Sequence, residues 1–103
     1  MKNIAKLADK IKSELKDAKD DYTTASHLIC EIETKELALV YKKIGLQELE
    51  HVMMWHGAVV KEIDKYKAMG HTVPPEMQAR YDVLHDLMIE EYSKTKADLE
   101  KIN

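Results

Sequence analysis

A carboxylate and an imidazole lie one helical turn apart near the middle of the chain, at Glu48 and His51. Residues three or four positions apart share a face of a helix, so these two side chains point in the same direction. Burying both polar groups without partners would cost free energy, so they require hydrogen bonds or a metal ion. The rest of this face is apolar and consists of Tyr41, Ile44, Val52, Trp55, Val59 and Tyr66.

The Glu-x-x-His spacing is the ligand spacing of carboxylate-bridged di-iron sites in helix bundles. With Glu14 upstream, the chain resembles the ferritin-like superfamily, and the rubrerythrins and small ferritin-like proteins in particular. This resemblance implies an iron or manganese site in which Glu14 is a terminal ligand, Glu48 bridges the ions and His51 donates nitrogen. It also implies that Tyr22 or Tyr41 orients these ligands through hydrogen bonds.

A complete di-iron site needs a second Glu-x-x-His, and the last third of the chain offers only His85 and Glu90, at the wrong spacing. The missing half would come from a second subunit, as in the short encapsulated ferritins that this arrangement resembles. The implied reaction is oxidation of ferrous ion by oxygen or peroxide. Asp17 or Asp21 could replace Glu14. The alternative is a buried polar pair, left over from such an ancestor, that binds no metal.

Composition indicates an all-α protein, because the 103 residues include only three Gly and two Pro, and no Phe. The chain is the right length for a single domain, residues 1–103. Hydrophobic periodicity predicts helices over about 2–29, 34–69 and 73–102. We expect them to form an antiparallel three-helix, ferritin-like bundle, in which Thr34 is the N-cap of the second helix and Gly70 ends it.

The expected reversal between the first two helices determines which residues face each other. If the chain turns near Ile32, the numbers of facing residues in an antiparallel hairpin sum to about 64. Glu48 then faces residue 16, and His51 faces residue 13. Glu14 lies between these positions, so the first two helices alone can bring it to Glu48 and His51.

A second function competes with metal binding, because the reversal contains Leu, Ile and Cys where turns usually carry Gly, Pro, Asn or Asp. Together with the outer face of the second helix, these residues predict an apolar patch of the size that marks a protein interface. Our primary prediction is a non-catalytic interaction or self-assembly module that requires no cofactor and binds a protein partner or a second copy. The patch could be natural or redesigned on a ferritin-like scaffold. It comprises Leu28, Cys30, Ile32, Leu39, Val40, Met53, Met54 and Trp55.

Net charge and cysteine content narrow the possible partners and the cellular compartment of the protein. The net charge of −3, with Lys and Glu interspersed, argues against nucleic acid or an anionic membrane as a partner. No apolar run approaches the length of a membrane span. The single cysteine, Cys30, cannot form an internal disulfide, which favours a cytoplasmic setting. His85 is expected to be a core imidazole, and His56 shares no ligand spacing with His51.

Overall fold

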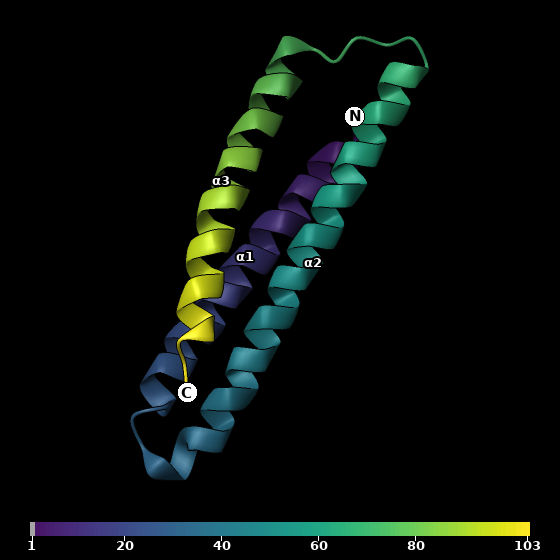
Figure 1. The fold of residues 1–103 in the computed structure, drawn as a ribbon. Coiled ribbons are helices and arrows are strands. Elements are labelled where there is room, and N and C mark those ends of the chain that lie inside the picture. Colours follow the sequence, from purple (N-terminus) through teal and green to yellow (C-terminus); the bar gives the residue numbers. More distant parts are fainter. Residues whose placement is uncertain (1) are drawn as a thin grey trace.

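The computed structural model confirms an all-α protein with three long helices. It describes residues 2–103, apart from the side chains of Lys2, Met77, Arg80 and Leu84. Over this range the elements are α1 (Lys2–Leu28), the 3-10 turn η1 (Ile32–Thr34), α2 (Lys35–Ala68) and α3 (Pro75–Glu100), and no strand is present. Figure 1 shows the chain running down α1, up α2 and down α3.

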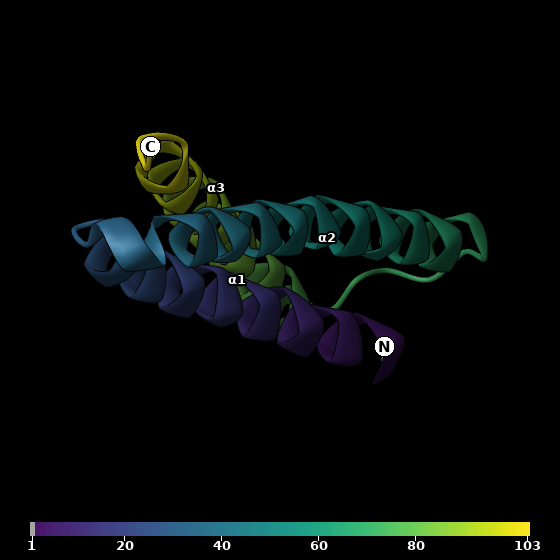
Figure 2. The ribbon, with the colours of Figure 1, turned by 90° about the horizontal axis from the view of Figure 1, so that it is seen from below.

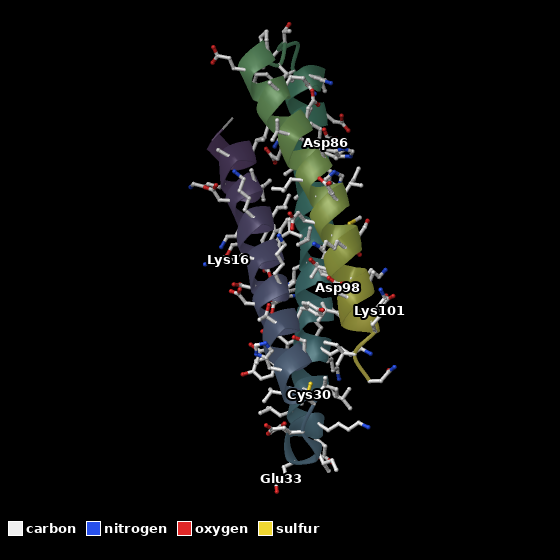
Figure 3. All side chains as sticks on the ribbon, turned by 90° about the vertical axis from the view of Figure 1, so that its left-hand side faces the viewer. Lys16, Cys30, Glu33, Asp86, Asp98 and Lys101 are labelled. Carbon is white, nitrogen blue, oxygen red and sulfur yellow. The ribbon has the colours of Figure 1, made fainter. Side chains whose placement is uncertain are left out.

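The reversal after α1 is closed by a threonine hydroxyl. Thr34 lies at the expected N-cap position, but its side chain does not cap α2. Instead its Oγ1 donates a hydrogen bond of 2.6 Å to the carbonyl of Leu28, which is the last residue of α1. The same carbonyl also accepts a bond from the N–H of Glu31 at 3.3 Å. Two donors at this helix end therefore hold the turn, which contains no Gly or Pro. Figure 3 places Cys30 and Glu33 at this end of the molecule.

The connection from α2 to α3 follows a known C-terminal pattern. Gly70 has a positive φ of 84°. Its N–H donates a hydrogen bond to the backbone carbonyl of Lys67, and the N–H of His71 donates one to the backbone carbonyl of Tyr66. This pair of bonds is a Schellman motif, which confirms Gly70 as the residue that ends α2. α3 begins at Pro75, later than the expected residue 73, because a residue that precedes proline is held extended and Pro74 has ψ 141°.

The core lies mainly between α1 and α2, and α3 crosses this pair obliquely (Figure 2). Its fully buried side chains include Ile11 of α1, Leu49 and Val52 of α2 and Leu99 of α3. α3 packs closely against α2 at Gly45, where a Cβ atom would lie only 2.9 Å from Leu99 Cδ1. At the same end of α3, Lys42 Nζ donates to the carbonyl of Ile102 at 2.7 Å.

The molecule is a rod of 59 × 17 × 17 Å with a radius of gyration of 16.6 Å, against about 13 Å for a compact domain of this length. Its shape leaves α2 exposed on both sides of the core. Ile44, expected on the buried face of α2, is 41% exposed. The buried face of α2 instead consists of Ala38, Gly45, Leu49, Val52, Val59 and Ile63.

Candidate functional site

Four carboxylates from α1 and α2 gather at one level of the rod. Glu14, Asp17 and Asp21 follow one another at steps of three and four residues, so they share a face of α1. Glu48 lies on the facing side of α2, one turn beyond Gly45, whose missing Cβ would lie 3.5 Å from Asp21 Cβ. We call Glu14, Asp17, Asp21 and Glu48 the carboxylate cluster.

The distances within the carboxylate cluster are short. Glu14, Asp17 and Glu48 each contribute an oxygen, and these oxygens lie within 4.8 Å of one another. The imidazole of His51 contacts Glu14, with Nδ1 3.4 Å from Glu14 Oε1. The structure therefore brings Glu14 to Glu48, as the hairpin numbering predicts, and adds Asp17. His51 reaches Glu14 but is not in the group of ligand atoms found among the described residues. Metal binding by these residues stays a prediction.

Burial and the neighbouring carboxylates together raise the pKa of Glu48. Burial, followed by a hydrogen bond with Asp21 and the charges of Asp21, Asp17 and Glu14, raises the pKa of Glu48 from 4.5 to about 8. At neutral pH Glu48 therefore holds a proton, which it shares with the Asp21 carboxylate. Its Oε2 is buried and has no hydrogen-bond partner among the described residues.

The donor set fits a divalent cation. Oxygens bound to one cation at 2.0–2.6 Å are separated by about 3 to 5 Å, and the three carboxylate oxygens lie within 4.8 Å of one another. A cation would also stabilise the charged form of Glu48, which burial and the neighbouring carboxylates disfavour. His51 could add nitrogen, although its side chain is 53% exposed. This mixture of carboxylate and imidazole suits iron or manganese.

The two tyrosines expected to orient the ligands do not contact them through hydrogen bonds. Among the described side chains, neither the Tyr22 nor the Tyr41 hydroxyl makes a hydrogen bond. Both rings pack against the hydrophobic core. Tyr22 also lines a shallow groove beside Asp98 and Ile102 at the end of α3. The expected role in orienting the ligands therefore has no support in their hydrogen bonding.

Most residues of the expected apolar patch face solvent. Ile32 is 94% exposed and Met54 is 71% exposed. Leu28 is half-buried, and Trp55 packs partly against the core, so these two contribute less surface than expected. Leu37 and Ile44, which the patch did not include, are also exposed on α2. The other exposed members of the patch are Cys30, Leu39, Val40 and Met53.

A second polar group, absent from the sequence prediction, lies between α2 and α3. The rings of His56 and His85 have centroids 5.5 Å apart, and Tyr81 stacks on His56. These residues come from helices that are distant in sequence. No local spacing relates them, but both lie about 15 residues from the centre of the second reversal, near residue 71. The numbering along an antiparallel hairpin that paired Glu14 with Glu48 could therefore have found this pair as well.

Comparisons with models of known protein families, with curated proteins and with solved structures found no match to this chain. The functional assignment therefore depends on the residues of the chain itself. Among the helices described between residues 2 and 103, none has both the length and the apolar character needed to cross a bilayer.

Proposed function

We propose that this protein is a non-catalytic helical module that self-associates through the exposed apolar side chains of the first reversal and α2. The arrangement we propose for each chain is an antiparallel, ferritin-like bundle. The observation that carries the proposal is the exposure of large apolar side chains along α2 and the 3-10 turn that precedes it. We call this set the α2 surface, and it comprises Ile32, Leu37, Leu39, Val40, Ile44, Met53 and Met54.

The total accessible area supports this proposal. The chain exposes 7053 Å², whereas a compact monomer of 11.9 kDa is expected to expose about 5,900 Å². The excess of about 1,100 Å² is similar to the 800 Å² or so that each partner contributes to a stable interface. Burying the α2 surface against a second copy would remove much of this excess. Methionine side chains suit such a contact because they adapt to irregular surfaces.

A second copy is the partner that this chain favours, and a dimer is the state we expect. Ile44 and His51 are both exposed on α2, within two turns of each other. Docking at the α2 surface would therefore bring a second carboxylate cluster near the first. The lone, exposed Cys30 is compatible with the cytoplasmic setting that we propose.

The test is the oligomeric state, measured by size-exclusion chromatography with light scattering. Wild-type protein should form dimers, whereas Leu39→Asp/Met53→Asp should be a monomer with unchanged helical content by circular dichroism. Charged side chains in the contact would be desolvated without partners. The matched control is Lys61→Asp/Lys65→Asp, which alters exposed residues outside the α2 surface and should leave the dimer intact. A wild-type chain that stays monomeric at high concentration would refute self-association.

A dimeric di-iron carboxylate protein is the second candidate, favoured by the short distances in the carboxylate cluster. Glu14, Glu48 and His51 of each chain would hold half of the site, with Asp17 as an additional oxygen donor. Iron bound there would catalyse the oxidation of ferrous ion by oxygen or peroxide. Anaerobic titration with Fe²⁺ or Mn²⁺ should detect binding that Glu48→Ala abolishes while the fold persists. Equal binding by Glu48→Ala and wild-type protein would rule this candidate out.

A further inference from the structure

A pair of histidines, one from α2 and one from α3, meets at the first half of α3. His56 and His85 are both half-buried, and their ring centroids lie 5.5 Å apart with 41° between the planes. Tyr81 covers the pair, with its ring centroid 6.5 Å from that of His56 and 6.0 Å from that of His85. Neither histidine belongs to the carboxylate cluster or to the α2 surface.

The Nε2 atom of His56 is buried and has no hydrogen-bond partner among the side chains that the structure describes. No bond to those side chains replaces the hydration that this polar atom loses on burial. Burial lowers the pKa of His56, and the neighbouring His85 lowers it further. His56 is therefore neutral at neutral pH, and a neutral imidazole is the form that binds a metal ion.

The separation of the two rings fits a shared ion. With metal–nitrogen distances of about 2.0–2.1 Å and tetrahedral angles, two imidazoles on one zinc ion have ring centroids roughly 5 Å apart. The observed 5.5 Å requires only a small adjustment of side chains. Imidazole nitrogen favours zinc, copper or nickel, whereas carboxylate oxygens favour harder cations. The histidine pair and the carboxylate cluster would therefore prefer different metals.

We propose that His56 of α2 and His85 of α3 together bind a divalent transition-metal ion that fastens the first half of α3 to α2. The side of α3 that faces away from the pair is open. Val83 is 69% exposed, and a groove between α1 and α3 is lined by Ala8 and Lys12 on one side and by Ala79 and Val83 on the other. Water would complete the coordination of the ion.

Zinc titration tests this proposal, with Zn²⁺ alone as the probe and calorimetry as the readout. His85→Ala should weaken one zinc-binding step by at least about tenfold, while circular dichroism shows that the helices persist. His71→Ala is the matched control, because His71 stacks on Tyr66 away from the pair and its loss should change nothing. His85→Cys should retain binding, since a thiolate also ligates zinc. Equal zinc affinity in His85→Ala and wild-type protein would overturn the proposal.

Nuclear magnetic resonance of the wild-type imidazoles gives a readout that does not depend on how the variants fold. Addition of Zn²⁺ should shift the ring signals of both His56 and His85, because each nitrogen donates to the ion. The ring signals of His27, which is exposed near the end of α1, serve as the internal control. Zinc that leaves the signals of His56 and His85 unchanged would overturn the proposal. If His85→Ala still forms the dimer, zinc binding by the histidine pair is independent of self-association through the α2 surface.

Discussion

Replacing Glu48 by glutamine should stabilise the protein at high pH and leave it nearly unchanged at low pH. The raised pKa of Glu48, about 8 instead of 4.5, means that the folded chain keeps a proton that the unfolded chain has released between these two values. The free energy of unfolding therefore falls as pH rises from about 4.5 to 8 and then levels off. Glutamine carries no charge and can still donate a hydrogen bond to Asp21. The free energy of unfolding of the variant therefore does not fall in this way as pH rises.

The magnitude follows from the size of the pKa change and the partial exposure of the side chain. Each pH unit between the two pKa values corresponds to about 1.4 kcal/mol. Glu48 is only half-buried, and solvent screening reduces the total to about 2 kcal/mol. Glu48→Gln should therefore exceed the wild type in stability by about 2 kcal/mol above pH 8 or so, with little difference near pH 5.

Urea unfolding followed by circular dichroism measures this difference. The titrations are run with a chelator present, because a divalent ion in the carboxylate cluster would neutralise the same repulsion. Glu50→Gln is the matched control, since Glu50 is exposed on the same helix and should alter stability by no more than about 0.5 kcal/mol. A Glu48→Gln effect of equal size at both pH values would refute the electrostatic explanation.

Two further predictions concern glycine contacts and the first turn. Gly45→Ala should lower stability by about 1 kcal/mol, because its Cβ would lie 2.9 Å from Leu99 Cδ1. Gly57→Ala, with no atom within 4 Å of its Cβ, should raise stability by about 0.5–1 kcal/mol. Equal urea midpoints for the two variants would contradict this. Thr34→Val removes the donor to Leu28 and should cost about 1 kcal/mol; an unchanged midpoint would show that the bond is dispensable.

Helix content and helix ends were the most predictable features. The spacing of apolar residues and the scarcity of Gly and Pro are local properties, and they predicted three helices at nearly the observed positions. Gly70 ends α2 as expected because the Schellman motif depends on only six consecutive residues. The Thr34 hydroxyl was harder to predict, since it bonds across the turn to the preceding helix instead of to its own.

The candidate site was predicted in part. Numbering along a hairpin was enough to expect Glu14 near Glu48 and His51, because facing positions depend only on where the chain reverses. Asp17 and Asp21 were recognised as possible replacements for Glu14, but their joint effect on Glu48 was not. That effect depends on burial and on distances of a few ångströms, and neither quantity can be read from helical periodicity.

The sequence by itself determined the number of helices, their approximate ends and the facing positions of Glu14 and Glu48, because each of these follows from spacing along the chain. Only the tertiary structure decided which part of α2 is buried and that Ile44 stays exposed. The physical reason is that these features depend on the oblique packing of α3. That angle results from side-chain contacts between distant segments, such as Leu99 against Gly45.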